Sequence, residues 1–210
     1  MNINVIKKIF PIDNCNNIHE LKYDSEGLWS ISHPNHANKL SEAIKSYNNL
    51  ELNTILDSTA GLGGNTLSFA KKFNKVTSIE YNFNRFKMLS NNVKCYDFNN
   101  IELYHGDLID LIPKFNEKID VVFVDPPWGG PNYKEDSNLK IELSNKNLAE
   151  VTKIISTYNY QGNKVKLIVY KLPYNFNFIE ITEECKNIIR SEFKITEGNI
   201  IYLFLEMKTD

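Results

Sequence analysis

From residue 54 onward, the chain alternates short apolar segments with segments of helical periodicity. One apolar segment, Ile119–Val124, shows no alternation of polar and apolar residues, which is typical of a strand buried on both faces. Strands that alternate with helices form a parallel sheet covered by helices on both faces. The pattern therefore predicts a doubly wound α/β fold. The expected strands are Thr54–Asp57, Lys75–Glu80, Ile101–Tyr104, Ile119–Val124 and Val165–Tyr170.

The segments between and around these strands complete the expected topology. Phe193–Thr196 and Ile200–Glu206 flank a Glu197–Asn199 turn, so we expect the sheet to end in an antiparallel hairpin. We expect residues 1 to about 30 to be irregular. The expected helices are Pro34–Tyr47, the glycine-rich turn to about Phe73, Asn84–Val93, Leu108–Phe115, Leu148–Thr157 and Ile179–Arg190.

Composition limits the class of protein. A chain of 210 residues with 42% hydrophobic and 24% charged residues is typical of a soluble globular protein with one domain. With no repeat or linker, we predict an N-terminal extension at residues 1–48 and a single globular domain at 49–210. No apolar run reaches the length of a membrane helix, and the N-terminus lacks the apolar core of a signal peptide.

Charge and cysteine content narrow the possible partners. The net charge of -2 argues against wholesale binding of a nucleic-acid backbone. Arginine occurs only at Arg85 and Arg190, so lysines would have to contact phosphate. The three cysteines, Cys15, Cys95 and Cys185, are widely spaced, which favours neither a metal site nor disulfides and indicates a reducing compartment.

A glycine-rich turn follows the first expected strand, with the sequence DSTAGLGGNT from Asp57 to Thr66. Such a turn before a helix can bind a cofactor, or it can be an ordinary packing turn. Thr66 stands where a dinucleotide fingerprint has its last glycine, which weakens an NAD interpretation. Glu80 ends the next strand, where it can bind ribose hydroxyls, and Asp107 follows the third strand, where it can bind an adenine amino group. Acids at these strand ends resemble the S-adenosylmethionine-dependent methyltransferases.

The segment after the fourth strand reads Asp125-Pro126-Pro127-Trp128. An acid followed by Pro-Pro-aromatic resembles the signature of methyltransferases that act on amide or exocyclic nitrogens. A carboxylate and the Pro126 carbonyl can accept the two N–H bonds of such an amine, and Trp128 can stack on the target base. Orientation of this kind supplies most of the expected acceleration.

Three segments carry a narrower resemblance. PPWGGPNY, from Pro126 to Tyr133, resembles the PPWGGP segment of the trimethylguanosine synthase family, which methylates guanine N2 of RNA caps. Asp24–Ser32 and Ala60–Thr66 resemble two further segments of that family. The resemblance implies a class I methyltransferase fold (a Rossmann-like, mostly parallel sheet) with a short N-terminal helical extension. It also implies S-adenosylmethionine as cofactor, no metal, and 7-methylguanosine-capped RNA as partner.

The family resemblance implies roles for individual residues. The catalytic residues would be Asp125, Pro126 and Trp128. Trp128 would also face the positively charged 7-methylguanine ring, which an indole binds well. The cofactor-binding residues would be Phe10, Ser32, Asp57, Gly61, Gly63, Asn65, Thr66, Glu80, Asp107 and Asp125. The substrate-binding residues would be Trp128, Asn92, Pro131, Tyr133, Lys134 and Lys171.

The chain departs from the family pattern at three positions. Asp125 stands where the family mostly has serine, which leaves the target amine open. Ser32-His33-Pro34 replaces a Thr-Pro-Glu segment, and Tyr174 replaces an arginine thought to hold a cap phosphate. Without that arginine, the candidates for phosphate contact are Lys171, Lys134 and Tyr133.

Several functions therefore remain open. The leading hypothesis is N2 methylation of a 7-methylguanosine cap, giving the 2,7-dimethyl form and, after a second transfer, the 2,2,7-trimethyl form. The alternatives are methylation of another amine, such as adenine N6 or a protein amide, and a cap-binding module without turnover. We expect a monomer that does not bind membranes and acts inside the cell, in the nucleus or cytoplasm, or as a viral protein in its host.

Overall fold

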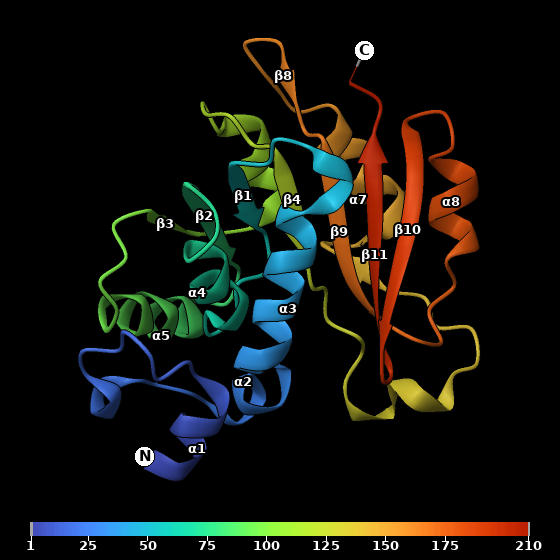
Figure 1. The fold of residues 1–210 in the computed structure, drawn as a ribbon. Helices are drawn as coiled ribbons and strands as arrows, with labels where there is room; N and C mark the ends of the chain where they lie inside the picture. Colours follow the sequence, from blue (N-terminus) through green and yellow to red (C-terminus); the bar gives the residue numbers. More distant parts are fainter. Residues whose placement is uncertain (1, 210) are drawn as a thin grey trace. The chain divides into compact units, whose positions relative to one another are not determined.

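The structure is a computed structural model that describes residues 2–209, apart from the side chain of Pro131. The chain divides into two compact units, residues 1–108 and 109–210. Each unit is described by itself. Figure 1 labels most of the helices and strands of both.

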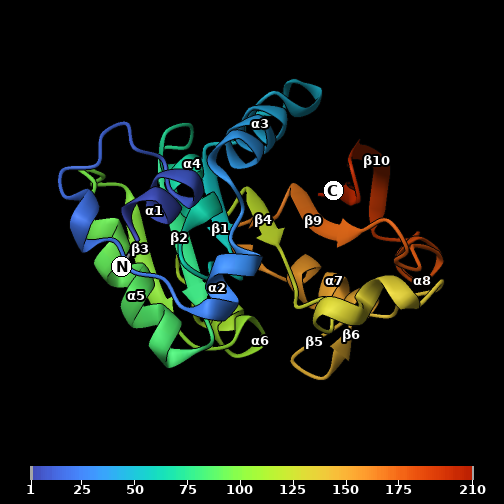
Figure 2. The ribbon, with the colours of Figure 1, turned by 90° about the horizontal axis from the view of Figure 1, so that it is seen from below.

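The first unit contains three parallel strands, with β2 between the other two. Thr54 of β1 pairs with Lys75 of β2, and Val76 of β2 pairs with Ile101 of β3. Helix α5 packs against β2 and β3 (Figure 2). The elements are α3 (Pro34–Lys45), η2 (Tyr47–Asn49), β1 (Thr54–Asp57), α4 (Gly64–Ala70), β2 (Lys75–Glu80), α5 (Phe83–Lys94) and β3 (Ile101–His105).

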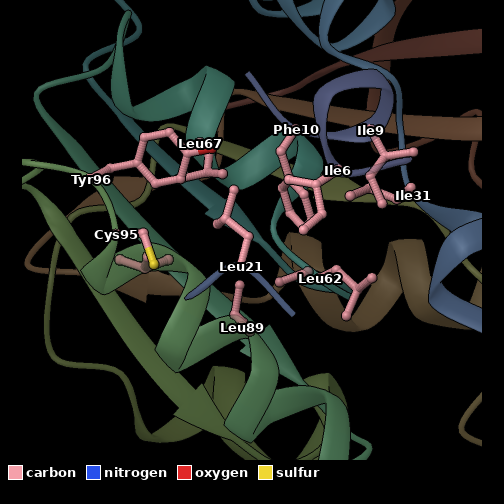
Figure 3. Close-up of a cluster of buried hydrophobic side chains, with 12 residues drawn as sticks. Ile6, Ile9, Phe10, Leu21, Ile31, Leu62, Leu67, Leu89, Cys95 and Tyr96 are labelled. Carbon is pink, nitrogen blue, oxygen red and sulfur yellow. The ribbon is translucent and has the colours of Figure 1, made fainter. Parts of the chain in front are cut away.

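Short helices cover about half of the segment before residue 34, where the sequence predicted irregular structure, so that detail of the prediction was wrong. The elements are α1 (Ile3–Ile9), η1 (Ile18–Glu20) and α2 (Ser25–Ser30). These helices are too short to be recognised from hydrophobic periodicity. A side chain caps the N-terminus of each α-helix: Asn2 accepts a hydrogen bond from the Asn4 N–H, and Asp24 accepts one from the Gly27 N–H. Ile6, Ile9 and Leu21 bury the segment in an apolar cluster of the first unit (Figure 3). The predicted N-terminal extension is therefore helical.

The second unit joins one parallel pair of strands to an antiparallel hairpin. β4 pairs in parallel with β9, β9 pairs antiparallel with β11, and β11 pairs antiparallel with β10. The main elements are β4 (Val121–Val124), η4 (Pro131–Glu135), α7 (Leu148–Ser156), β9 (Leu167–Pro173), α8 (Ile179–Glu184), β10 (Ile189–Glu197) and β11 (Ile200–Met207). The predicted C-terminal hairpin is confirmed.

Short elements that the sequence did not reveal fill the remaining connections. Two small hairpins are formed by β5 (Glu142–Leu143) with β6 (Lys146–Asn147) and by β7 (Asn159–Tyr160) with β8 (Asn163–Lys164). The predicted helix Leu108–Phe115 is one α-helical turn, α6 (Leu108–Leu111), followed by the 3-10 turn η3 (Ile112–Lys114). Pro113 lies inside that second turn, and proline does not continue an α-helix because it lacks an N–H.

The last predicted helix, Ile179–Arg190, is too long by about one and a half turns. Helix α8 ends at Glu184, and Cys185 accepts hydrogen bonds from the N–H groups of both Ile188 and Ile189. The chain therefore turns and enters β10 at Ile189. None of the helices within residues 2–209 is long and apolar enough to span a membrane.

Candidate active site

The first group of predicted site residues surrounds the turn between β1 and α4. We call it the glycine-turn cluster: Ser32, Asp57, Gly61, Gly63, Asn65, Thr66 and Glu80. Asp57 is fully buried at the end of β1, and its Oδ2 accepts a hydrogen bond of 2.7 Å from the Thr66 hydroxyl. Thr66 Oγ1 also lies 3.1 Å from Ser78 Oγ in β2. These side chains hold the turn against the strands beneath it.

The two glycines of the turn serve different purposes. Gly63 has φ +99, a backbone conformation that other residues rarely adopt, so the turn requires glycine there; a Cβ would also lie 2.9 Å from Leu89 Cδ1. Gly61 has φ +56, and no atom lies within 4 Å of the Cβ position. Open space beside a backbone in this conformation allows a ligand to approach the main chain closely.

The Glu80 carboxylate fixes the same turn from β2. Its Oε2 accepts a hydrogen bond of 2.8 Å from the Gly61 N–H, and its Oε1 accepts one of 2.8 Å from the Asn82 N–H. Arg85 Nε lies 4.0 Å from Oε1, and Arg85 Nη1 lies 3.0 Å from Glu26 Oε1 in α2. A carboxylate has about four acceptor positions, so Glu80 keeps capacity for ligand hydroxyl groups.

Asn65 supplies the clearest sign of a ligand. Its Nδ2 donates to Ser32 Oγ at 3.0 Å, so the structure brings these two predicted residues together. Its Oδ1 is buried and has no hydrogen-bond partner within residues 2–209. Buried acceptors are normally satisfied, and a ligand N–H would satisfy this one. Asp107 is half-buried two residues beyond the end of β3.

Two predicted site residues of the first unit are buried and have structural contacts. Phe10, predicted to contact the cofactor, is only 1% exposed and packs within the apolar cluster (Figure 3). Asn92, predicted to contact the target base, is fully buried in α5. Its Oδ1 accepts from the Lys22 N–H at 2.7 Å, and its Nδ2 donates to the Lys22 and Leu62 carbonyls at 2.9 and 3.1 Å. These three hydrogen bonds show that Asn92 anchors the backbone of the first unit, and contact with a base stays a prediction.

The second group lies in the second unit. We call it the Asp125 cluster: Asp125, Trp128, Tyr133 and Lys171. Asp125 follows β4, and its Oδ2 lies 2.7 Å from Lys171 Nζ in β9. The exposed fractions of the two side chains are 16% and 9%. Burial raises the pKa of the Asp125 carboxyl, and the Lys171 ammonium opposes that rise.

Lys171 also contacts the tryptophan of the cluster. Trp128 Nε1 donates to the Lys171 carbonyl at 3.3 Å, and Lys171 Nζ lies 5.9 Å from the Trp128 ring centroid. Tyr133 meets the indole edge-on, with ring centroids 5.1 Å apart. Pro126 is buried, and Gly129 and Gly130 have open space at their Cβ positions. The cluster thus presents an ion pair beside a half-buried indole.

The remaining predicted residues lie in the loop after the cluster. Lys134 is exposed, with its Nζ 5.7 Å from the Tyr133 ring centroid. Pro131 opens the 3-10 turn η4, and its side chain falls outside the described part of the structure. Tyr174, at the position of the family arginine, is 49% exposed. Lys171, predicted to contact phosphate, instead has its ammonium in the ion pair with Asp125.

The contacts of Arg85 and Asn175 were not predicted from the sequence, nor was the pairing of Lys171 with Asp125. Arg85 links Glu80 to Glu26, and Asn175 Nδ2 donates to the carbonyls of Tyr133 and Asp136. Lys171 could have been paired with Asp125 by aligning the fourth and fifth strands, since Val124 pairs with Tyr170 and these two residues come next. Arg85 acts on two carboxylates that are far apart in the sequence, and Asn175 acts on main-chain carbonyls, so no pattern of residue types reveals either role.

The glycine-turn cluster fits S-adenosylmethionine in its donor and acceptor set. The open space at Gly61, the unsatisfied Asn65 Oδ1 and the Glu80 carboxylate suit a ligand that carries an amino group and ribose hydroxyls. In residues 2–209, no group of three or more His, Cys, Asp or Glu side chains could hold a metal ion.

Comparisons with known proteins agree on the family and the fold. Residues 52–208 match the sequence profile of a family described as RNA cap guanine-N2 methyltransferase. An uncharacterized protein of Acanthamoeba polyphaga mimivirus is 32% identical over 225 residues, covering 95% of this chain and 86% of the relative. The trimethylguanosine synthase of Schizosaccharomyces pombe is 26% identical over 179 residues, covering 73% of this chain and 74% of the relative.

A solved structure supports the fold class. The precorrin-6y C5,15-methyltransferase of Geobacter metallireducens superposes with a TM-score of 0.59 at 13% identity, covering 95% of this chain and 99% of that chain. At this identity the likeness concerns the fold alone. The predicted α/β fold of class I methyltransferases is therefore confirmed.

Proposed function

Because this chain belongs to the RNA cap guanine-N2 methyltransferase family, we propose that it methylates the exocyclic N2 amine of a 7-methylguanosine RNA cap. Family membership makes the chain an S-adenosylmethionine-dependent methyltransferase; the cap substrate is the proposal. The observation that carries it is the Asp125 cluster, in which a buried carboxylate lies beside an indole. We also propose that the protein acts inside a cell, where capped RNA occurs.

The glycine-turn cluster would hold the cofactor. S-adenosylmethionine supplies a methyl group already activated on a sulfonium centre. Glu80 would accept hydrogen bonds from the ribose hydroxyls, and Asn65 Oδ1 would accept one from the amino group. Gly61 leaves the main chain accessible, so the turn can lie close to the ligand.

The Asp125 cluster would orient the amine. An aromatic amine is a poor nucleophile because its lone pair is delocalised into the ring. A carboxylate that accepts an N–H bond from this amine helps to localise the lone pair, and such a charge-assisted bond is about twice as strong as a neutral one. The Pro126 carbonyl is the second proposed acceptor. Orientation of the amine would then provide most of the acceleration.

Trp128 would bind the ring of the base. A 7-methylguanine ring carries a positive charge, and an indole face attracts a cation by up to about 2 kcal/mol when water is excluded. The indole N–H is already bonded to Lys171, so the ring is held in one orientation. For the cap phosphates, exposed Lys134 is the stronger of the two lysine candidates, because Lys171 is paired with Asp125.

One observation favours a second candidate substrate. Asp125 replaces the serine of most family members, and an acid before Pro-Pro-aromatic resembles the methyltransferases of adenine N6 and glutamine amides. Adenine N6 in nucleic acid is therefore the alternative acceptor.

A competition among RNA substrates distinguishes these acceptors. The protein is incubated with cofactor carrying a labelled methyl group and three RNAs of one sequence, ending in 7-methylguanosine, in an unmethylated guanosine cap, or uncapped. We expect label only in the first RNA, at its cap nucleoside. Label in the adenosine of all three RNAs would favour the alternative, and no label in any of them would contradict both.

A further inference from the structure

The buried ion pair between Asp125 and Lys171 is set by the register of two strands. β4 and β9 lie side by side in the second unit, and Val124 pairs with Tyr170 (Figure 1). Asp125 and Lys171 are the next residue along each strand direction, and their charged atoms lie 2.7 Å apart. The pairing of the strands thus brings the Lys171 ammonium to the Asp125 carboxylate.

The carboxylate and the ammonium depend on each other. Their side chains are only 16% and 9% exposed, so each charge has lost most of its hydration. Removing one partner of a buried pair leaves the other charge uncompensated, and that is far more damaging than removing both. A serine at position 125 would need no counter-charge, whereas an aspartate does.

Lys171 holds the indole as well as the carboxylate. Its main-chain carbonyl accepts the Trp128 Nε1–H at 3.3 Å, and its ammonium lies 5.9 Å from the ring centroid. Both distances fit the usual ranges for a weak hydrogen bond and for a cation near an aromatic ring. A single residue therefore contacts both groups that we propose to act on the target base.

We infer that Lys171 is the positioning residue of the Asp125 cluster, fixing the Asp125 carboxylate through its ammonium and the Trp128 indole through its carbonyl. This inference rests on the proposed function. It assigns Lys171 to orientation of the amine-binding groups and removes it from phosphate binding. Lys171 and Asp125 then act as one unit.

A four-variant cycle tests the inference: the unmodified protein, Lys171→Met, Asp125→Ser and the double variant. With 7-methyl-GTP as acceptor, we expect Lys171→Met to lower kcat about 10- to 100-fold, because it removes the ammonium that lies 2.7 Å from the Asp125 carboxylate. In the Asp125→Ser background, the same change is expected to lower kcat by less than about threefold. Lys171→Arg keeps the charge and is expected to retain most of the activity.

An exposed ion pair of the same unit supplies the matched control. Lys153 Nζ lies 2.7 Å from Glu184 Oε2, and both side chains are nearly half exposed. Lys153→Met makes the same chemical change outside the cluster. We expect its kcat and melting temperature to equal those of the unmodified protein within experimental error. Equal losses in Lys153→Met and Lys171→Met would overturn the inference. So would additive effects of the two cluster variants, or a raised KM with unchanged kcat in Lys171→Met, which is the pattern of a phosphate contact.

Thermal unfolding of the same four variants needs no acceptor. We expect Lys171→Met to lower the melting temperature, and we expect the double variant to regain part of the loss. If Lys171→Met does not fold, folding of the double variant would show the same coupling between the two residues. Additive losses of stability would overturn the inference. Failure of the unmodified protein to methylate 7-methyl-GTP would contradict the proposed function instead, and the unfolding cycle would still decide whether the two residues act together.

Discussion

At the scale of single residues, the Trp128 side chain is constrained at two edges. Its N–H donates to the Lys171 carbonyl, and the Tyr133 ring meets it edge-on. The side chain is still only half-buried, and Gly129 and Gly130 leave open space next to it. A core tryptophan has neither feature, so the indole is suited to stack on a base.

Truncating the Trp128 indole is expected to weaken binding of the substrate and not of the cofactor. Trp128→Ala should weaken binding of 7-methyl-GTP by about 1–3 kcal/mol, the usual contribution of base–aromatic stacking. Binding of S-adenosylhomocysteine should change little, because the proposed cofactor residues lie in the glycine-turn cluster. Calorimetry measures both affinities, with Trp29→Phe as control because Trp29 is 88% exposed and outside both clusters. Equal losses for both ligands would identify Trp128 as a structural residue.

The protonation of Asp125 predicts a pH dependence. Burial raises the pKa of this carboxyl from its ordinary value, and Lys171 offsets only part of the rise. Since only the ionised form accepts the amine N–H as a charged acceptor, kcat should fall as the pH falls through this raised pKa. Asp125→Ser should keep partial activity and lose this acidic limb of the profile. An identical acidic limb in Asp125→Ser would assign it to another group.

How far the sequence predicted the site depends on what each residue contacts. Gly61, Glu80 and Asp125 could be singled out from the sequence because chemistry or backbone conformation favours their residue types, and their binding roles stay predictions. Phe10 and Asn92 were singled out by family resemblance, and the packing of Phe10 and the backbone hydrogen bonds of Asn92 were not visible in the sequence. Residue type alone does not tell an asparagine that binds a ligand from one that anchors a chain.

At the scale of elements, the strands were the most predictable part of the chain. β1 and β2 match the predicted ranges, since apolar segments between polar turns allow few alternatives. The end of α8 was missed because the Cys185 turn contains neither glycine nor proline. The helices before residue 34 were missed because their six or seven residues are too few to show a period.

Helix α5 offers a test at this scale, because its neighbouring residues Asn91 and Asn92 make different hydrogen bonds. Buried Asn92 makes three hydrogen bonds to the main chain of Lys22 and Leu62, whereas Asn91 Nδ2 makes a single one to the Glu20 carbonyl. Asn92→Ala should destabilise the protein by about 2–4 kcal/mol, and Asn91→Ala by about 1 kcal/mol or less. Chemical unfolding measures both. A stable Asn92→Ala variant with a raised KM for the cap would restore the base-binding role.

At the scale of the whole molecule, the chain has the α/β fold of its family and only a small net charge. The net charge of -2 gives no general attraction to RNA, so the proposed RNA substrate would have to be recognised locally, at its cap. A cationic base on an indole provides such local recognition. We therefore expect 7-methyl-GTP to bind at least about tenfold more tightly than GTP, which is roughly 1.4 kcal/mol. Equal dissociation constants in calorimetry would remove the charge of the base as the basis of selection.

The position of the transferred methyl group tests the central claim most directly. The protein is incubated with S-adenosylmethionine and either 7-methyl-GTP or GTP, and the products are analysed by mass spectrometry with fragmentation to the base. We predict that 7-methyl-GTP gains a methyl group on its guanine at the exocyclic amine and that GTP stays unchanged. Methylation of both nucleotides, or of neither, would contradict the cap guanine-N2 assignment.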